Sequence, residues 1–581
     1  MRKLGLATLA AVSVWGLIVA CGSNDKTSGF DTPQDTGDSG PVGIVDEAGN
    51  VIGLGGEGGT AGDGGLPTGE TRDPKDCNEA KTSHSYVGCD YWPTVVANNV
   101  WSIFDYAVVV SNAGTAPADI TVTGGALAGP KTTTVQPGAL ATIYLPWVPE
   151  LKGPDTDECG LATPLPASVV KTGGAYHLVS TTPVIVYQFN SLEYKGAGGE
   201  GADGGTKDWS QCPGTVKKCA SNANMPLGCN SFSNDASLLL PSTAMTNNYR
   251  VIAHAGWSET NGLPPPFQQV TDVMGATLTV TATQDATTVT MTLNASAKVL
   301  AGGGIAATTG GKLVVPLAKA GDVVELALEK GDKYDFSGSL VQSDKPVQVI
   351  TGVPCINIPA GNRFCDHIEE SVIPAETLGK HYVITMPDKP AGGVGKGVIR
   401  FYGNQDGTNL TYNPSMPAGC PGALKAGQVV ECKIASADFE VTGDKEFAAA
   451  MFTPGAEIYG ASNLGDPDHT IFPAVEQFRT KYLFLAPKDY DVSFADIIGT
   501  GDAAPVLDGK AVGAAFTKIG NGPFGVWRVS LDGGPKMDGA HTLTSKSPVG
   551  LQVMGYGADT SYMYPGGLNL NLISAPPPPP K

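Results

Sequence analysis

The sequence predicts an all-β protein made of tandem β-sandwich units with an immunoglobulin-like strand pattern. Gly and Pro contribute 77 and 44 of the 581 residues, far more than the roughly 12% that the two supply together in an average chain. Only 16% of the residues are charged while 41% are hydrophobic, so sizeable cores can form but coiled coils and helical bundles are excluded. Short apolar runs are separated by turn residues about every 8–12 positions, which is typical of a β-sandwich.

The N-terminus carries the pattern of a secretory signal. Arg2 and Lys3 precede an apolar run from Leu4 to Ala20, which corresponds to a charged region followed by a hydrophobic region. The run ends in Leu17-Ile18-Val19-Ala20-Cys21, which resembles the bacterial lipobox. We therefore expect residues 1–20 to be a lipoprotein signal peptide and Cys21 to carry the lipid. An ordinary signal with a chance cysteine is the alternative.

The expected location is an outer membrane or cell surface. Gly22 follows the cysteine, in place of the Asp that marks retention at the inner membrane. No later stretch approaches the length of apolar sequence needed to span a bilayer, so the lipid would be the only membrane anchor.

Residues 21–76 are predicted to form a flexible, acidic, Gly-rich tether. Positions 22–76 hold 11 acidic and 3 basic residues and almost no aromatic ones, so they cannot bury enough apolar surface to offset the entropy of ordering. Asp35-Thr36-Gly37 and Gly37-Asp38-Ser39-Gly40 match protease signatures by chance, because such catalytic groups need rigid surroundings and partner residues. We expect no catalytic residues here.

The cysteine count fits an exported protein. There are 11 cysteines, and removing the predicted lipid site leaves an even number, which indicates a disulfide set. Short loops favour Cys355–Cys365 and Cys420–Cys432, and Cys77–Cys89 is plausible. The sequence leaves the pairing of Cys159, Cys212, Cys219 and Cys229 open, with a zinc site as the competing interpretation.

Two sequence elements recur along the chain. The first is an apolar run, a proline and then a tyrosine about eight residues later, as in Leu238–Pro241 followed by Tyr249. The second is a polar strand, a turn and an apolar strand, as in Tyr176–Tyr187 and Ser339–Ile350. Proline suits the first residue of a strand, where no ladder donor is needed. The recurrence predicts four units of five to seven short strands each.

The predicted boundaries follow from these repeats. They are β unit 1 at 89–192, a Gly- and Cys-rich insertion at 193–231, β unit 2 at 232–354, β unit 3 at 366–456, β unit 4 at 468–573 and a Pro-rich tail at 574–581. We expect the tail to be a frayed terminus. A propeller blade uses four strands in roughly 40–45 residues, which fits the spacing less well, so a β-propeller-like closed arrangement is the alternative fold.

Two segments resemble the N-terminal domain of the IgGFc-binding protein family. They are Phe232–Pro241 and Cys365–Pro374, the latter preceded by Asp344-Lys345-Pro346-Val347-Gln348-Val349. The resemblance covers roughly residues 90–490 and weakens in the last unit. Related domains occur in exported lipoproteins of the myxobacterial type. The resemblance implies an extracellular binding or adhesion role, and it does not transfer antibody binding.

Few residues look capable of metal chemistry. None of the seven histidines has the spacing of a metal motif, and His367 beside Cys365 is the best ligand candidate, although the family pattern implies a structural role in a disulfide loop. Asp466 and Asp468 could hold Ca²⁺ through their carboxylate oxygens, whereas Gly465-Asp466-Pro467-Asp468 also reads as a turn. No cofactor is expected apart from this calcium candidate.

Exposed aromatic residues would mark a binding face. Trp147, in Leu145-Pro146-Trp147-Val148-Pro149, and Trp209, in the insertion, are the two candidates. The expected partner is an extracellular protein or glycan. Nucleic acid is excluded, because phosphate binding needs clustered Lys and Arg and the net charge is −19.

The predicted function is a non-enzymatic binding or adhesion role at a bacterial cell surface. No Gly-x-Ser-x-Gly elbow or phosphate-binding glycine loop is present. A structural component of the envelope is the alternative, and an exported hydrolase is a more distant one, which would require acid and base groups converging in one cleft.

Overall fold

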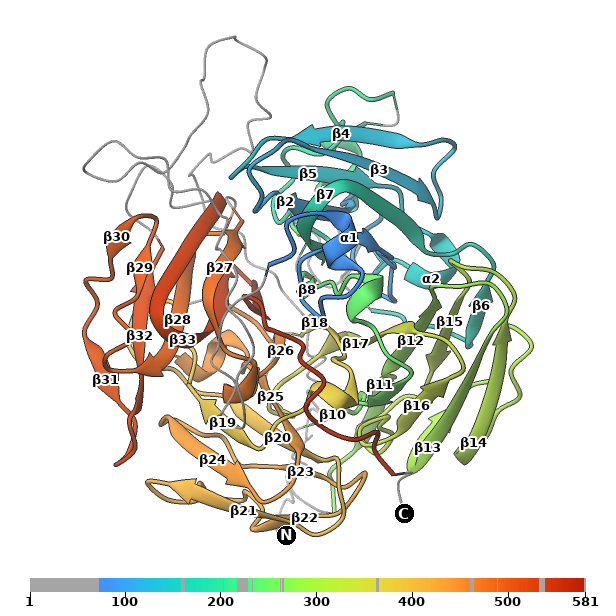
Figure 1. The fold of residues 1–581 in the computed structure, drawn as a ribbon. Coiled ribbons are helices and arrows are strands. Elements are labelled where there is room, and N and C mark those ends of the chain that lie inside the picture. The colour runs from blue at the N-terminus through green and yellow to red at the C-terminus, as the bar shows by residue number, and fades with distance from the viewer. Residues whose placement is uncertain are drawn as a thin grey trace, which may run out of the picture.

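The strands of this protein fall into four sets that repeat one pairing plan around a common axis (Figure 1). The computed structural model describes residues 73–157, 162–201, 203–216, 228–231, 233–261, 263, 266–361, 365–459, 464–487, 490–531 and 539–578. Helices in these residues are short: α1 (Cys77–Ala80), α2 (Pro149–Lys152) and α3 (Pro213–Val216), with 3-10 turns at Trp209–Gln211, Ser242–Ala244, Ala375–Thr377, Ala456–Tyr459 and Val475–Gln477.

We define four units by hydrogen-bonded pairing. Unit 1 contains β1 (Gly88–Tyr91), β2 (Tyr106–Ser111), β3 (Ala118–Gly124), β4 (Lys131–Val135), β5 (Leu140–Leu145), β7 (Tyr176–Asn190) and β8 (Ala236–Leu238). Unit 2 contains β9 (Asn248–Arg250), β12 (Thr277–Ala282), β13 (Thr287–Val299), β14 (Thr308–Leu317), β15 (Val323–Ala327), β16 (Leu340–Ser343), β17 (Val347–Ile356) and β18 (Asp366–Ser371).

The other two units follow the same order. Unit 3 contains β19 (His381–Ile384), β20 (Val398–Gly403), β21 (Thr408–Asn413), β22 (Ala423–Leu424), β23 (Val429–Glu431), β24 (Phe439–Gly443), β25 (Phe447–Phe452) and β26 (His469–Ile471). Unit 4 contains β27 (Arg479–Ala486), β28 (Val492–Thr500), β29 (Val506–Leu507), β30 (Lys510–Ala511), β31 (Phe516–Lys518), β32 (Phe524–Ser530), β33 (Gly539–Gly557) and β34 (Thr560–Pro565).

Each unit is a sandwich of an inner and an outer sheet. The inner sheets have the orders β8-β7-β2-β5, β18-β17-β12-β15, β26-β25-β20-β23 and β34-β33-β28-β32. The outer sheets have the orders β1-β7-β3-β4, β9-β16-β13-β14, β19-β24-β21-β22 and β27-β33-β29-β30. The predicted sandwich fold is confirmed.

The polar-turn-apolar element is the strand that joins the two sheets of each unit. In β7 the residues before Pro183 alternate in burial, as expected for an outer sheet with one solvated face, while all the residues from Val184 on are buried. β33 repeats this as one continuous strand, whereas units 2 and 3 divide the element into β16 and β17 and into β24 and β25. The second recurring sequence element thus marks the link between the sheets.

Four short strands line the axis of the molecule (Figure 1). β8 packs against β18 and β34, and β26 packs against the same two strands, which closes a ring. The closed arrangement that the sequence left as an alternative is therefore present together with the sandwich units. We call β8, β18, β26 and β34 the inner strands.

Neighbouring units exchange strands. The inner strands β8, β18 and β26 each come from the sequence that opens a later predicted unit, yet each pairs with the sheet of the unit before it. In addition, β6 (Val169–Lys171), from the sequence of unit 1, pairs with β15 of unit 2. One buried apolar cluster accordingly includes residues from all four units.

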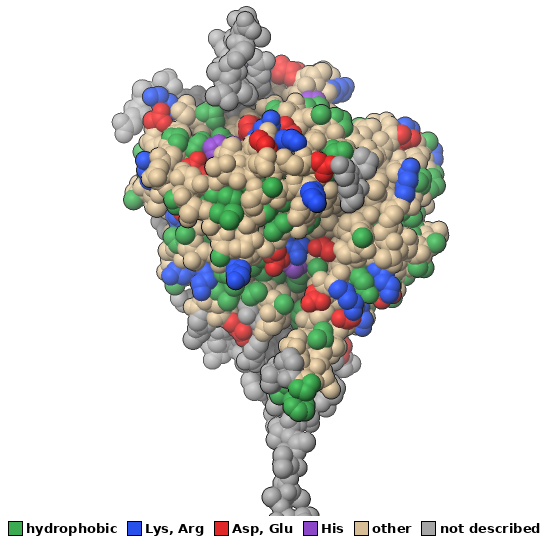
Figure 2. Space-filling model, turned by 90° about the horizontal axis from the view of Figure 1, so that it is seen from below, with side chains coloured by type: hydrophobic (Ala, Val, Ile, Leu, Met, Phe, Trp, Pro, Cys, Tyr) green, Lys and Arg blue, Asp and Glu red, His purple; other side chains and the backbone are tan. Residues whose placement is uncertain are grey.

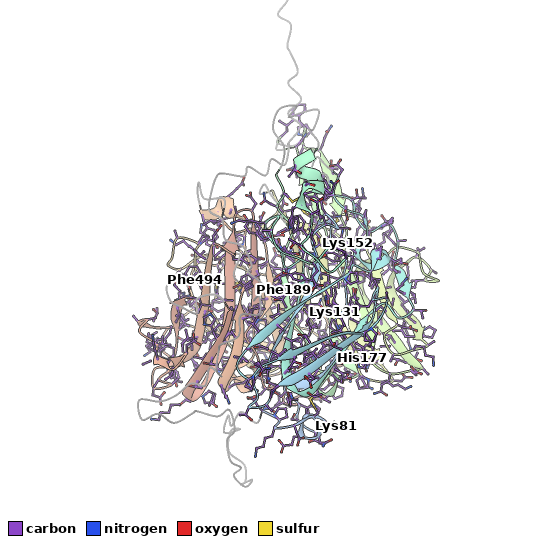
Figure 3. All side chains as sticks on the ribbon, turned by 90° about the horizontal axis from the view of Figure 1, so that it is seen from above. Lys81, Lys131, Lys152, His177, Phe189 and Phe494 are labelled. Atoms are coloured by element: carbon purple, nitrogen blue, oxygen red, sulfur yellow. A yellow bond between two sulfur atoms is a disulfide. The ribbon has the colours of Figure 1, made fainter. Side chains whose placement is uncertain are left out.

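Units 1 and 4 close the ring, and Figure 3 shows the strands around Phe494 beside those around Phe189. The buried Arg479 forms an ion pair with Asp73, donates to Asn569 Oδ1 at 2.8 Å and lies over the Tyr86 ring. Tyr187 donates to the Leu483 carbonyl at 3.3 Å. Residues near both ends of the described chain thus meet at this junction.

The C-terminal segment runs across the ring. Leu568 and Leu570 are buried, the Ile573 and Ser574 amides donate to the Glu376 carbonyl, and Arg250 donates to the Pro578 carbonyl at 2.7 Å. The expectation of a frayed terminus is wrong for residues 574–578, because the Glu376 carbonyl and the Arg250 side chain hold them. We call residues 566–578 the strap.

Candidate functional site

The segments that lead into the four inner strands meet at one end of the axis. The Asn234 amide donates to Asp366 Oδ1 at 2.9 Å, and Thr560 donates to Asp366 Oδ2 at 3.0 Å. Leu464 bridges Ala558, and Ser561 donates to the Asp466 carbonyl. We call this end the axial face. A loop face held by a rigid sheet scaffold is where binding residues concentrate in many folds.

A group of buried carboxyl side chains lies beneath the axial face. Its members are fully or almost fully enclosed and come from the starts of three inner strands: Asp235, Asp366, Glu369, Glu370, Asp466 and Asp468. We call this group the axial cluster. Buried carboxylates require hydrogen-bond donors, a cation or a proton, so the partners of each one decide its state.

Asp366 and Glu369 are well supplied with donors. Asp366 also accepts from the His367 amide at 2.7 Å. Glu369 accepts from Gln188 at 3.1 Å, from Ser237 at 3.0 Å and from Asn190. The Glu369 amide in turn donates to Asp235 Oδ2 at 2.9 Å. These bonds join units 1, 2 and 4 at the axis, which gives both carboxyl groups a structural role.

Asp466 and Asp468 are different. Within the described residues, neither side-chain oxygen of Asp468 nor Oδ1 of Asp466 has a hydrogen-bond partner. Burial raises the pKa of Asp468 to about 7. Burial, aided by the charge of Asp366, raises the pKa of Asp466 well above its ordinary value. These carboxyl groups are therefore held in a state that favours protonation.

The opposite end of the inner strands is apolar. A small cavity of about 10 Å³ lies there, which is room for about one water molecule; its lining is mostly apolar but includes Glu370 of the axial cluster and Ser371. Among the described residues, the inner strands thus pack around a cavity that is too small for a ligand larger than water.

A second feature of the axial face is a projecting hairpin. β10 (Trp257–Thr260) and β11 (Val270–Met274) form a two-stranded sheet, and β11 packs against β17 near the loop that precedes β18. Leu263, Phe267 and Val270 are 51%, 70% and 60% exposed. They are three of the ten exposed large hydrophobic residues in the described chain. We call residues 257–274 the finger.

The finger is held firmly at its base and near its tip. Trp257 and Met274 are buried opposite one another in the hairpin register. The Asn261 side chain donates to the Phe267 carbonyl at 3.0 Å and accepts from the Gln269 amide at 2.9 Å. No charged residue occurs from Thr260 to Thr271. Exposed apolar side chains in an uncharged stretch are suited to contact with another molecule.

The arrangement matches a known family. The family model described as IgGFc binding protein matches residues 235–555, which is more than half of the chain. The chain belongs to the IgGFc-binding protein family. The match begins at Asp235 of the axial cluster and ends within β33. No curated protein matches the chain.

Membership of the IgGFc-binding family confirms the predicted resemblance, with a shift in its extent. The match runs through unit 4, where the resemblance was expected to weaken, and it leaves out the sequence that precedes Asp235. That preceding sequence nevertheless builds unit 1 on the strand plan of the other three units. The family is a binding family, and nothing found for this chain indicates catalysis.

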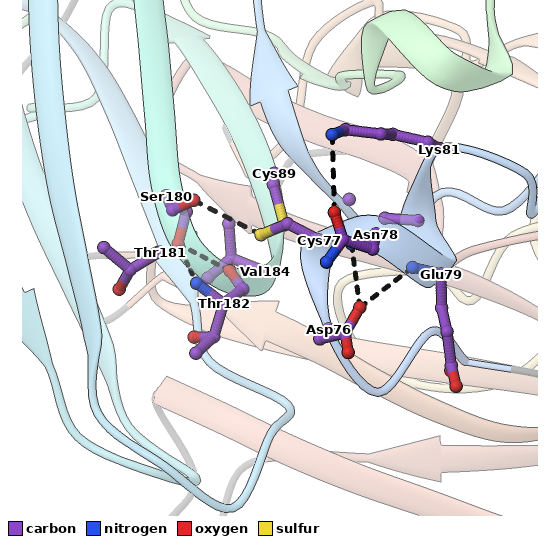
Figure 4. The surroundings of a disulfide bond; sticks show 12 residues. Asp76, Cys77, Asn78, Glu79, Lys81, Cys89, Ser180, Thr181, Thr182 and Val184 are labelled. Carbon is purple, nitrogen blue, oxygen red and sulfur yellow. Dashed lines mark hydrogen bonds between the residues drawn. A yellow bond between two sulfur atoms is a disulfide. The ribbon is translucent and has the colours of Figure 1, made fainter.

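The three predicted disulfides are present in this IgGFc-binding chain. Cys77–Cys89, Cys355–Cys365 and Cys420–Cys432 are bonded, and Cys212–Cys229 joins them from the group that sequence alone left unpaired. Figure 4 shows that the Cys77–Cys89 bond ties α1 to unit 1, with Asp76 capping α1 and Cys77 Sγ 3.4 Å from the Ser180 carbonyl. Cys21, Cys159 and Cys219 lie outside the described residues.

The two tryptophan candidates lie in the scaffold. Trp147 is 8% exposed and donates to the Phe104 carbonyl at 2.6 Å, so it belongs to the core of unit 1. Trp209 is half-buried, donates to the Gly198 carbonyl at 3.1 Å and packs against Phe104. Their contacts explain both side chains without a ligand.

The metal candidates are also placed. His367 is fully buried, with Nε2 3.4 Å from Glu369 Oε2. Asp466 and Asp468 are buried in the axial cluster. Across the described ranges, no group of three or more His, Cys, Asp or Glu side chains is arranged to hold a metal ion.

Sequence reasoning missed the finger and most of the axial cluster. The string Leu263-Pro264-Pro265-Pro266-Phe267, in a charge-free stretch, was the available signal for the finger. The axial cluster had no comparable signal, because its carboxyl groups come from distant segments.

In the part of the chain that the structure describes, no helix is both long enough and apolar enough to cross a bilayer.

Proposed function

We propose that this chain is a bacterial surface lipoprotein that binds an extracellular protein or glycan through its axial face and catalyses no reaction. Membership of a binding family supports the non-enzymatic part. The four disulfides support an oxidising, extracytoplasmic location. The observation that carries the choice of surface is the finger, on which three apolar side chains are exposed.

The charge pattern supports a partner recognised by shape and apolar contact. Figure 2 shows acidic and basic side chains scattered singly and in mixed groups over the face it presents, among mostly uncharged surface. The finger adds no charge from Thr260 to Thr271 either, so this part of the surface gives little electrostatic steering. Affinity would then rest on a few well-packed apolar anchors, as in most protein interfaces, and Phe267 is the aromatic residue in the finger that can serve as one.

A binding screen tests this proposal. The full mature chain, made soluble by Cys21→Ser, would be presented to immobilised immunoglobulin, mucin, glycan arrays and whole-cell surfaces. We expect saturable binding to at least one of these probes. We expect the triple variant Leu263→Ser, Phe267→Ser, Val270→Ser to weaken that binding at least about tenfold, because each lost anchor in an interface commonly costs 1 kcal/mol or more.

The control replaces three other exposed apolar residues. Val179, Val314 and Met416 are 40%, 51% and 54% exposed on other parts of the surface, and their replacement by Ser should leave binding unchanged. If the finger variant binds as tightly as the control, the binding surface lies elsewhere. If the unaltered chain binds none of the probes saturably, the result favours a structural role in the envelope over a binding role.

The lipid anchor has its own test. In cells, the unaltered protein should fractionate with membranes and incorporate labelled fatty acid, because a cysteine at the end of the lipobox-like run is the acceptor. Cys21→Ser should remove the label and release the protein into the soluble fraction. Continued membrane retention of this variant would contradict anchoring through Cys21.

A further inference from the structure

The inner sheet of unit 4 packs one apolar face against unit 3. Phe494, Met554 and Tyr556 from this face belong to the same buried cluster as Ile384 and Met386 of unit 3. Asp496 lies two positions after Phe494 on β28, so both point to the same side of the strand, and Asp496 is fully buried. A carboxyl group therefore sits inside an otherwise apolar joint.

Three carboxyl groups surround one arginine at this joint. Asp388, from the β19–β20 connection, is 3% exposed, and Asp438 immediately precedes β24. Arg528, on β32, lies opposite Asp496 in the strand register. Arg528 Nη2 is 2.8 Å from Asp438 Oδ1 and donates to the Met386 carbonyl at 3.0 Å. Arg528 Nε is 3.9 Å from Asp388 and 4.0 Å from Asp496. The guanidinium is thus bonded chiefly to Asp438.

Asp388 and Asp496 lack close hydrogen-bond donors. Within the described residues, no N–H or O–H group donates to either side-chain oxygen of Asp496 or to Oδ2 of Asp388. Asp388 Oδ1 and Asp496 Oδ1 lie 3.9 and 4.0 Å from the same Arg528 Nε atom, so the two carboxyl groups are neighbours, and each affects the pKa of the other. Two buried carboxyl groups in contact cannot both ionise without a large cost, and they commonly share one proton.

We propose that Asp388 and Asp496 share a proton across the joint between units 3 and 4, and that loss of this proton as pH rises loosens the joint. The proton supplies the one hydrogen bond that this pair has. When it leaves, two carboxylates face each other in an apolar interface beside a single guanidinium that is already engaged. The joint then becomes a pH-sensitive point of the ring.

The electrostatics agree with this geometry. Burial raises the pKa of Asp496 well above its ordinary value; Arg528 opposes the rise, while Asp388 and Asp438 add to it. Burial likewise raises the pKa of Asp388, against the effect of Arg528. A folded-state pKa above the unfolded value of about 3.9 gives stability that is complete below that pH and is lost as pH rises through the folded pKa.

The other groups facing the pair do not change this sign. Tyr556, on β33, donates its hydroxyl to the Asp388 carbonyl at 2.6 Å, and burial raises the pKa of that phenol, so it stays neutral. Gln552 lies opposite Asp496 on β33 and bonds to the Ile471 carbonyl at 3.2 Å. Arg528 stays charged, because Asp496 and Asp438 outweigh burial and raise its pKa.

The test is thermal unfolding of Asp496→Asn and Asp388→Asn across a pH range. Asparagine keeps the shape and replaces the shared proton with permanent N–H donors. At about pH 8.5 each variant should melt at least about 2 °C above the unaltered protein, and at about pH 3.5 the difference should vanish, because the pair is then protonated in both the folded and the unfolded state. Hydrogen exchange of the β28 and β32 amides should slow in the variants at about pH 8.5.

Asp335→Asn is the matched control. Asp335 accepts from Arg400 at 2.9 Å between units 2 and 3, and Arg400 outweighs burial to hold its pKa low. This variant should melt lower, not higher, at about pH 8.5. The proposal is overturned if Asp496→Asn and Asp388→Asn melt no higher than the unaltered protein at that pH, or if the gain is equal at both pH values. Failure of both variants to fold would overturn it too, since it would show that ionised carboxylates are required.

Discussion

At the scale of single residues, the joints between units treat buried charge in opposite ways. Between units 2 and 3, Arg400 Nε is 2.8 Å from Glu431 and Arg400 Nη1 is 2.9 Å from Asp335. One guanidinium thus neutralises two carboxylates at close range. Between units 3 and 4, Arg528 lies 2.8 Å from Asp438 but 3.9 and 4.0 Å from Asp388 and Asp496. The latter two are the pair that we propose to share a proton. Acid should weaken the first joint and base the second.

Glu431→Gln tests the acid-sensitive joint. Although burial raises the pKa of Glu431, bonding to His254 and the charge of Arg400 bring it down to about 2. A folded pKa below the unfolded value of about 4.3 contributes stability above that pH, and the contribution is lost as pH falls through about 2. The variant should therefore melt below the unaltered protein at about pH 7, and the gap should narrow below about pH 4. A constant gap at every pH would contradict the ion pair as its cause.

At the scale of elements, the strands themselves were well predicted from the sequence. The recurring segment Tyr176–Tyr187 lies within β7, and Ser339–Ile350 covers β16 and the start of β17. Local patterning decides whether a segment is a strand, and the recurring proline step and polar-turn-apolar element carry the repeat. The short loops closed by Cys355–Cys365 and Cys420–Cys432 were predictable for the same local reason.

Which sheet a strand joins was not predictable. The inner strands β8, β18 and β26 each directly precede a proline step in the sequence, so each is predicted to start the following unit, yet their hydrogen bonds go to the preceding unit. Packing around the axis decides which sheet an inner strand joins, and the sequence pattern contains no information about that packing. The axial cluster was invisible for this reason, since Asp235, Asp366 and Asp466 are far apart in the chain.

Exposure was equally hidden from the sequence. Trp147 looked like a surface candidate between two prolines, but its indole is needed to fill the core of unit 1. Phe267 lies in a proline-rich stretch whose pattern does not indicate exposure, yet its side chain is 70% exposed. Hydrophobic residue type alone cannot separate a core residue from a contact residue, because much of any folded surface is apolar.

At the scale of the whole molecule, the ring depends on a closure that involves residues near both ends of the described chain. Arg479 holds Asp73 on one side and Asn569 on the other. The strap then continues past unit 3 to Arg250 of unit 2. The strap thereby ties three units together on one face of the ring, in addition to the sheet pairing within each unit.

Truncation tests the role of the strap. Ending the chain after Pro565 removes the buried Leu568 and Leu570 and the Asn569 partner of Arg479. Loss of a buried Leu side chain typically costs about 2–5 kcal/mol, so this variant should melt several degrees lower, and exchange should quicken at β27. Ending the chain after Asn571 retains all three residues and should cost much less. Equal losses for the two truncations would contradict an anchoring role for Leu568 to Leu570.

The exchange of inner strands also orders events during export. A chain that passes through a membrane channel N-terminus first delivers β7 before β8, β17 before β18 and β25 before β26. Until the next segment arrives, the long strand of each unit keeps an open edge, which is a site for wrong pairing with another chain. The edge of β7 in unit 1 stays open longest, because the insertion separates β7 from β8. The inner sheet of unit 1 is complete only after the insertion has passed through the channel. Unit 4 needs only the short turn between Gly557 and Thr560, so β34 can cover the open edge of β33 as soon as it emerges.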